Sequence, residues 1–179
     1  MDKIITANKD LHVTQIRELF WEYLHWANAK VNNEFGVNFE IETMLEADMQ
    51  HLDKFMPPKG HLLLCYAQER LAGIACLKYL APSIGEIKRM YVRPGNRKRG
   101  LGRALINQLL EEASQIGYER VRLDSARFMK EAHHLYLTTG FSEIEAYEGS
   151  EIPKEFPEHW VFMEMELRGR KGKDSDTVG

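Results

Sequence analysis

The pattern of apolar and polar residues predicts strands and helices that alternate along most of the chain. Between residues 13 and 31, apolar side chains recur every three or four positions, which is typical of a helix with one buried stripe. The runs 61–67 and 71–77 are short, strongly apolar and separated by a tight connection, which predicts a hairpin. In chain order we expect a strand at 3–6, helices at about 13–31 and 41–55, strands at 61–67, 71–77 and 85–92, a helix at about 99–117, a strand at 120–124, a helix at about 129–139, a strand beginning at 141–144 and a closing strand at 159–167.

Hairpin links at the start and crossover links later indicate an α/β (α+β) fold around a mixed sheet. The length of 179 residues is that of one domain, which we place at residues 1–167. The remainder, 168–179, is charged and nearly free of apolar residues, so we expect a disordered tail.

One stretch stands out for its chemistry. A strand ending at Val92 is followed by a break at Pro94-Gly95 and by a basic, glycine-containing helix start at residues 97–103. The first N–H groups of a helix have no partner within the helix, and glycine lets a ligand approach bare backbone. Such a helix start is suited to binding phosphate groups.

Three phosphate-binding motifs compete for this stretch. The P-loop pattern fails, because Leu101-Gly102 stand where Lys-Ser/Thr is needed. A dinucleotide fingerprint is a weak alternative, since Leu105 replaces the third glycine, although Asp124 lies at a suitable distance for the acidic residue. The third pattern, Gln/Arg-x-x-Gly-x-Gly/Ala, fits at every position from Arg97 to Gly102.

This third pattern is followed by a second motif, Ala132-His-His-Leu-Tyr-Leu-Thr-Thr-Gly-Phe141. In this order, the two motifs resemble the acetyl-CoA site and the Ala-x-x-Leu-Tyr-x-x-x-Gly-Phe signature of the GCN5-related N-acetyltransferase (GNAT) superfamily. The resemblance spans residues 3–167 and implies a mixed, mostly antiparallel sheet of about seven strands, splayed between strands four and five and flanked by about four helices. It also implies that acetyl-CoA is the cosubstrate.

The resemblance assigns the cofactor contacts to two segments. The pantetheine arm of acetyl-CoA would pair with the splayed strand, and its pyrophosphate would meet the helix start. The residues so implied are Met90, Tyr91, Val92, Arg97, Lys98, Arg99, Gly100, Leu101, Gly102 and Arg103. Many relatives carry Asn three residues before the signature alanine, whereas this chain has Met129, so that pantetheine contact is in doubt here.

The same resemblance points to two catalytic side chains. Tyr136 occupies the position of the general acid that protonates the departing thiolate; the alternative is a core tyrosine that fixes its helix. Glu86 lies eleven residues before Arg97, a spacing that resembles the catalytic glutamate of histone acetyltransferases, and is our candidate general base. A structural or substrate-orienting role is its alternative. His133 and His134 are expected to be packing or surface residues, with a proton relay as a remote alternative.

For the acceptor pocket, Trp21 and Trp26 on the first helix either pack on the sheet or wall the pocket. The acidic residues between Glu40 and Asp53 form either a solvated helix face or a surface that attracts a cationic amine.

Charge and composition narrow the function classes. A net charge of −3 argues against a general nucleic-acid binder. Cys65 and Cys76 have no metal-ligand spacing, so we expect reduced core residues and no metal. With no signal peptide or long apolar run, we predict a cytoplasmic enzyme with no membrane partner. It would acetylate a primary amine of a small molecule or peptide by direct attack. A catalytically inactive CoA-binding regulatory domain is the alternative, and proteins of this arrangement often form homodimers.

Overall fold

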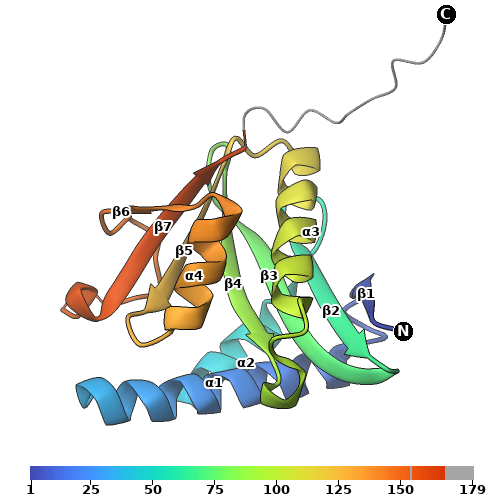
Figure 1. Cartoon of the computed structure of the whole chain (residues 1–179), viewed down its shortest axis with the longest axis horizontal. Helices are drawn as coiled ribbons and strands as arrows, with labels where there is room; N and C mark the ends of the chain where they lie inside the picture. Colours follow the sequence, from blue (N-terminus) through green and yellow to red (C-terminus); the bar gives the residue numbers. More distant parts are fainter. Residues whose placement is uncertain (154, 168–179) are drawn as a thin grey trace, which may run out of the picture.

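A seven-stranded sheet forms the centre of the protein, in the order β1, β2, β3, β4, β5, β7, β6 (Figure 1). The computed structural model describes residues 1–153 and 155–167, so the tail predicted at 168–179 lies outside the described residues. All neighbouring strands are antiparallel except β4 and β5, which are parallel. The strands are β1 (Lys3–Thr6), β2 (His61–Ala67), β3 (Arg70–Ala81), β4 (Ile84–Val92), β5 (Arg120–Ala126), β6 (Ser142–Ile144) and β7 (Trp160–Glu166). The predicted mixed sheet is confirmed.

Within the described residues, four α-helices cover the two faces of this sheet. They are α1 (Val13–Phe35), α2 (Ile41–Gln50), α3 (Leu101–Ile116) and α4 (Lys130–Thr139), with short 3₁₀ turns at Leu52–Phe55, Pro94–Asn96 and Pro157–His159. Successive side chains of a strand point to opposite faces of the sheet, so the sheet separates two hydrophobic cores. Leu63 of β2 packs with α3 and α4, whereas its neighbour Leu64 packs with α1 and α2. Figure 1 shows α3 and α4 in front of the sheet, with α1 and α2 crossing its lower end.

The helix boundaries differ from the predicted ones in two places. The first helix continues one turn beyond Val31 and ends at Gly36, whose φ of 67° closes it in the left-handed conformation. Val31 is buried and Phe35 packs beside it in the same cluster, so this apolar pair stabilises a turn that contains two weak helix formers, Asn32 and Asn33. The second helix changes to a 3₁₀ turn after Gln50.

Strand β3 is also longer than predicted, because its polar end pairs with β4. Lys78 lies opposite Glu86 and Tyr79 opposite Gly85, so the hairpin extends the sheet beyond the apolar run. This pairing places the start of β4, and with it the point where β4 meets β5.

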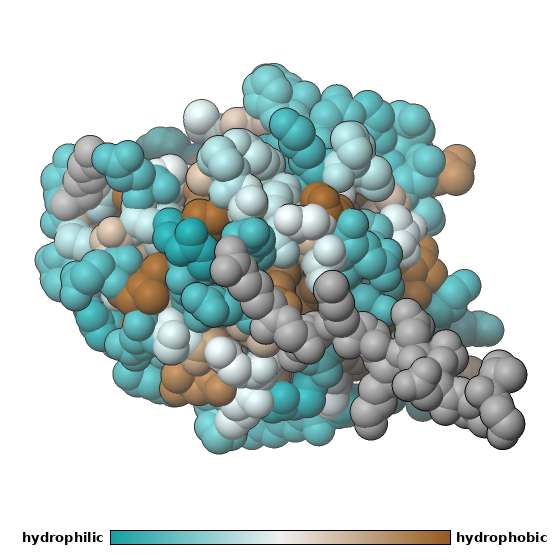
Figure 2. Space-filling model, turned by 90° about the horizontal axis from the view of Figure 1, so that it is seen from above, coloured by the Kyte–Doolittle hydropathy of each residue, from teal (hydrophilic) through white to brown (hydrophobic). Residues whose placement is uncertain are grey.

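The surface visible in Figure 2 is mostly hydrophilic, and apolar residues appear on it in small separate patches. Among the described residues, no helix has the length and apolar character required to cross a lipid bilayer.

Candidate active site

The two central strands part soon after they meet. Strand β4 pairs with β5 only from Ile84 to Glu86, opposite Arg120 to Arg122. Beyond Glu86 the edge of β4 that faces β5 has no strand partner among the described residues. An unpaired strand edge presents backbone N–H and C=O groups to any extended molecule that can add to the sheet.

A cavity of about 910 Å³ passes through this gap. Its walls come from both faces of the sheet, since α3 and α4 contribute Leu101 and Tyr136 whereas α1 and α2 contribute Trp26 and Asp48. The volume lies within the ordinary range of ligand sites. Because the cavity joins the two faces, two molecules that enter from opposite sides would meet between β4 and β5.

The start of α3 borders this cavity with unpaired backbone amides. Gly100 caps the helix with φ of 82°, and Lys98, two residues before it, also has a positive φ of 61°. No side chain in the described part of the chain caps the helix. The first helical backbone bond runs from Ala104 N–H to the Gly100 carbonyl, which leaves the N–H groups of residues 101–103 without an acceptor in the helix. A helix start of this kind carries a partial positive charge and binds anions.

The predicted phosphate-binding residues divide into two groups. Met90, Tyr91, Val92, Arg97, Lys98, Leu101 and Gly102 line the cavity, whereas Arg99, Gly100 and Arg103 do not. Arg99 lies 3.4 Å from Asp2, and Arg103 donates a hydrogen bond of 2.6 Å to Thr138. Their charges therefore act on the helix start from outside the cavity wall.

Arg97 has a structural role as well. Its Nε donates to the Val92 carbonyl at 2.9 Å, and its guanidinium lies over the rings of Trp26 and Tyr91. This bond fixes Arg97 beside the end of β4, at the wall of the cavity. Trp26 lines the cavity, whereas Trp21 is 39% exposed and lines a separate hollow between α1 and α2.

Tyr136 lies on α4 with its hydroxyl directed at the side chain of Met90 on β4. The hydroxyl is 3.7 Å from the sulfur of Met90, and the ring packs against Phe141 at 5.9 Å. Burial raises the pKa of Tyr136 well above its ordinary value, so the hydroxyl stays protonated across the neutral range. The group can therefore donate a hydrogen bond or a proton into the cavity.

Glu86 is fully buried and is absent from the residues that line the cavity. Its Oε1 accepts a hydrogen bond of 2.9 Å from the Tyr147 hydroxyl. Its Oε2 lies 3.0 Å from Nζ of Lys78, but in a direction that makes no hydrogen bond. Nζ of Lys88, which does line the cavity, is 3.8 Å from Glu86.

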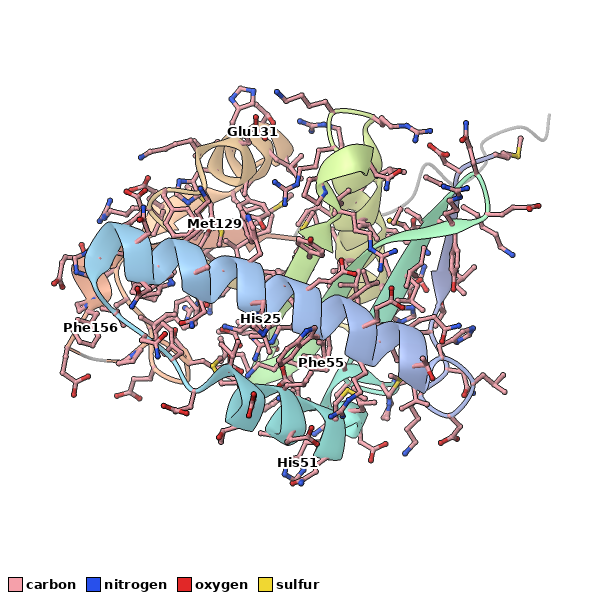
Figure 3. The ribbon with its side chains drawn as sticks, turned by 90° about the horizontal axis from the view of Figure 1, so that it is seen from below. His25, His51, Phe55, Met129, Glu131 and Phe156 are labelled. Atoms are coloured by element: carbon pink, nitrogen blue, oxygen red, sulfur yellow. The ribbon has the colours of Figure 1, made fainter. Side chains whose placement is uncertain are left out.

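Met129 lies at the start of α4, on the far side of α1 when the molecule is seen from below (Figure 3), and lines the cavity. Its sulfur is 3.5 Å from the Ser125 hydroxyl. His133, one turn further along α4, is buried and lies 3.2 Å from the same hydroxyl. Burial lowers the pKa of His133, so its ring is neutral near pH 7 and packs with β5 outside the cavity wall.

The sequence did not single out a cluster of ionised groups on the α1–α2 side of the cavity. Each of these side chains lines it: Asp48, Lys54, Lys88, Arg89, Asp124 and Glu151. Asp48 belongs to the acidic run on α2, but it is buried and bonded to Lys54 and Arg89 at 2.6 and 2.7 Å, whereas Glu42 and Glu46 are exposed. In the sequence, Asp48 was visible only as part of the acidic run and Asp124 only in the dinucleotide alternative. A further signal was the presence of two adjacent cations, Lys88 and Arg89, within an apolar strand.

Comparisons with known proteins agree on one family. A family model described as the acetyltransferase (GNAT) family matches residues 13–141. The uncharacterized N-acetyltransferase C1271.07c of Schizosaccharomyces pombe is 28% identical over 136 residues, which cover 75% of this chain and 80% of that protein.

Two solved structures share the fold. An acetyltransferase of the GNAT family from Staphylococcus aureus Mu50 has a TM-score of 0.70 at 20% identity, covering 94% of this chain and all of that one. The PaiA N-acetyltransferase of Thermoplasma acidophilum, solved in complex with coenzyme A, has a TM-score of 0.69 at 18% identity and covers 93% and 99% of the two chains. As its two sequence motifs predicted, the chain belongs to the GNAT family and is an N-acetyltransferase.

Proposed function

We propose that this enzyme transfers the acetyl group of acetyl-CoA directly to a primary amine of a small molecule or peptide. The acetyl donor of an enzyme in this family is acetyl-CoA, and the predicted family, enzyme class and cosubstrate are all confirmed at that level. The observation that supports the finer proposal is the through-going cavity at the β4–β5 gap. It lets an acetyl donor on the α3–α4 side reach an amine on the α1–α2 side.

The residues at the donor side fit acetyl-CoA. The amides of residues 101–103, with Arg97 and Lys98 beside them, supply the donors and positive charge that a pyrophosphate needs. The free edge of β4 at residues 90–92 supplies backbone groups for the amides of a pantetheine arm. When bound, acetyl-CoA supplies a thioester carbonyl that is open to attack and a thiolate that can leave.

The transfer must balance two protons. The acceptor is an ammonium ion near pH 7, so it loses one proton before attack and a second one once the C–N bond has formed at the acetyl carbon. As the C–S bond breaks the sulfur gains one proton, and the other is released to solvent. Tyr136 is the proposed donor to sulfur, because its hydroxyl is protonated and lies beside Met90 on the strand that would carry the thioester. Solvent would then return a proton to Tyr136.

The geometry favours Asp124 over Glu86 as the general base that accepts a proton from the amine. Asp124 lies on β5 just beyond the point where the strands part, and it lines the cavity. Its Oδ2 accepts a hydrogen bond from Lys88 at 2.9 Å and one from Ser150 at 3.1 Å, which leaves Oδ1 without a hydrogen bond among the described residues. Glu86 would act through Lys88, by holding the ammonium group that orients Asp124.

The experiment that tests this function is an acceptor screen. Purified protein with acetyl-CoA is mixed with a panel of amines, free thiol is followed over time, and products are identified by mass spectrometry. Thiol release with formation of an N-acetylated amine supports the proposal. Acetyl-CoA binding without turnover on any amine would instead favour a non-catalytic CoA-binding domain.

The predicted cytoplasmic location, the homodimer and the absence of a nucleic-acid partner stay predictions.

A further inference from the structure

Arg89 presents an unused hydrogen-bond donor on the acceptor side of the cavity. Its Nε donates to Asp48 at 2.7 Å and its Nη1 to Glu151 at 3.0 Å. Among the described residues nothing accepts a hydrogen bond from Nη2, although Arg89 is only 6% exposed and lines the cavity. A guanidinium presents paired N–H donors that suit a carboxylate, and here the Nη2 donors have no acceptor among the described residues.

The backbone of β4 is distorted to place this side chain. Arg89 has φ of 52°, a left-handed conformation that costs a non-glycine residue about 1–3 kcal/mol. The pairing of β4 with β3 shifts register here, between the partners of Ile74 and Cys76. Such an irregularity turns a side chain away from its regular face, and strain of this kind is concentrated at functional sites.

The same cavity wall carries unused acceptors. Among residues 1–153 and 155–167, Oδ1 of Asp124 and Oε1 of Glu151 accept no hydrogen bond, although both carboxylates are ion-paired through their other oxygen. Lys88 connects the two carboxylates, at 2.9 Å from Asp124 and 3.6 Å from Glu151. This wall therefore offers a partner for a carboxylate and a partner for an amine.

The ionised groups of this wall balance in charge. Three cations, Lys54, Lys88 and Arg89, stand with three carboxylates, Asp48, Asp124 and Glu151, and all six line the cavity. A zwitterion adds no net charge to such a cluster. A simple alkylammonium or polyamine would add uncompensated positive charge beside two buried cations, which is unfavourable at low dielectric.

Aromatic and aliphatic side chains also line the acceptor side, together with Asn28, Lys30 and Glu34 of α1. Its lining side chains include Trp26, Phe39, Phe128, Ile152 and Trp160. An apolar substituent would be removed from water there at a gain of about 25 cal/mol per Å².

We propose that the acceptor is an α-amino acid with an apolar side chain. Its carboxylate would bind Nη2 of Arg89, its amino group would face Asp124 and Glu151, and its side chain would contact the aromatic wall. The inference rests on the proposed function, since it names the amine that the same cavity would acetylate.

A matched set of acceptors tests this without any mutation. Phenylalanine, phenylalaninamide and phenethylamine share a side chain and an amino group but carry a carboxylate, a neutral amide or hydrogen; leucine with isoamylamine gives a second, aliphatic pair. The kcat/KM for acetyl transfer should be at least about tenfold higher for each amino acid than for its decarboxylated amine, which is the effect of one charge-assisted hydrogen bond. The kcat/KM for phenylalaninamide should be as low as that for phenethylamine, because neither compound carries a carboxylate.

The variant Arg89→Lys tests whether Arg89 binds the carboxylate of the acceptor. It keeps one positive charge but loses the paired N–H donors, so the preference for the carboxylate should fall to within about threefold while the dissociation constant of acetyl-CoA stays unchanged. Arg70→Lys, an exposed position at the start of β3, is the matched control and should keep the preference. If Arg89→Lys does not fold, the comparison of acceptors with the wild-type enzyme decides the question alone.

Two results would overturn the proposal, and they differ. Equal or faster acetylation of the decarboxylated amines would refute an amino acid acceptor and leave the acetyltransferase function intact. Bound acetyl-CoA with no acetylation of any amine in the set or in the wider screen would refute the proposed function and this inference together.

Discussion

The hydroxyl of Tyr136 lies 3.7 Å from the sulfur of Met90, so α4 contacts a side chain of β4 at the wall of the cavity. Among the described residues β4 has no strand partner there on the β5 side, so the hydroxyl lies in the same cavity as the edge to which an extended arm could add. This contact brings the second sequence motif, which contains Tyr136, next to the strand that leads into the first motif. It also places a proton donor next to the proposed path of the thioester.

Replacing Tyr136 with Phe should therefore lower kcat by about 10²-fold or more, the range expected for loss of a general acid. The dissociation constant of acetyl-CoA should change less than about threefold, since the ring remains. Steady-state thiol release and calorimetric titration would measure the two quantities. Tyr79→Phe, on an exposed tyrosine of β3, is the control. An unchanged kcat in Tyr136→Phe would leave Tyr136 with a packing role only.

Asp48 and Asp53 should differ in their effect on stability although both bind lysine. Asp48 is buried with Arg89 and Lys54, so Asp48→Ala leaves a buried guanidinium with fewer partners and should cost about 3–5 kcal/mol. Asp53 pairs with Lys9 on the exposed surface, so Asp53→Ala should lower the free energy of unfolding by less than about 1 kcal/mol. Urea unfolding of both variants measures the difference. Equal costs would contradict a buried ionic cluster.

Two glycines near the helix start provide a test of the phosphate site. A Cβ on Gly102 would lie 3.3 Å from Leu135 at the wall of the cavity, whereas a Cβ on Gly95 would meet nothing within 4 Å. Gly102→Val should weaken binding of acetyl-CoA by at least about tenfold, because it crowds the first turn of α3. Gly95→Val should leave binding nearly unchanged, as titration calorimetry would show. If both variants bind alike, the pyrophosphate does not lie at Gly102.

Glu151 should stabilise the fold more at neutral than at acid pH. Burial acts to raise its pKa, but Lys88 and Arg89 outweigh burial and lower the pKa from 4.5 to about 2. Because the folded state keeps the carboxylate ionised at lower pH than the unfolded chain does, this stabilisation is complete above pH 4.5 and is lost as the pH falls towards 2. It amounts to at most about 3.5 kcal/mol, at about 1.4 kcal/mol for each pKa unit.

Urea unfolding of wild type and Glu151→Gln over this pH range measures the effect. The gap in unfolding free energy between the two proteins should shrink from about pH 6 to about pH 3. Glu148→Gln, on an exposed side chain of the same loop, should show no such trend. A gap that is independent of pH would mean that Glu151 is not held ionised by its neighbours.

The strand end, turn and helix start that we assign to the acetyl donor could be located from sequence because they are neighbours in the chain. The end of β4, the turn at Pro94 and the start of α3 are consecutive, and their geometry follows from local rules about strands, prolines and helix starts. The predicted splay between the fourth and fifth strands is also confirmed, since β4 pairs with β5 only from Ile84 to Glu86. That prediction came from the family resemblance, which rested on this same segment.

The acceptor side could not be predicted because its parts meet only in the folded chain. Arg89 bonds to Asp48 and Glu151 across 41 and 62 positions of sequence, and its left-handed backbone breaks the alternation that would assign its side chain to a face. Glu86 illustrates the same limit. Its spacing from Arg97 was visible, but its burial against Tyr147, 61 residues away, was not.

A crystal structure of the protein with acetyl-CoA tests the central claim most directly. The account predicts the pyrophosphate within hydrogen-bond distance of the amides of residues 101–103. It also predicts the pantetheine arm alongside Met90 to Val92, with the thioester sulfur near the hydroxyl of Tyr136. Acetyl-CoA bound outside the gap between β4 and β5, or with its sulfur remote from Tyr136, would contradict the account.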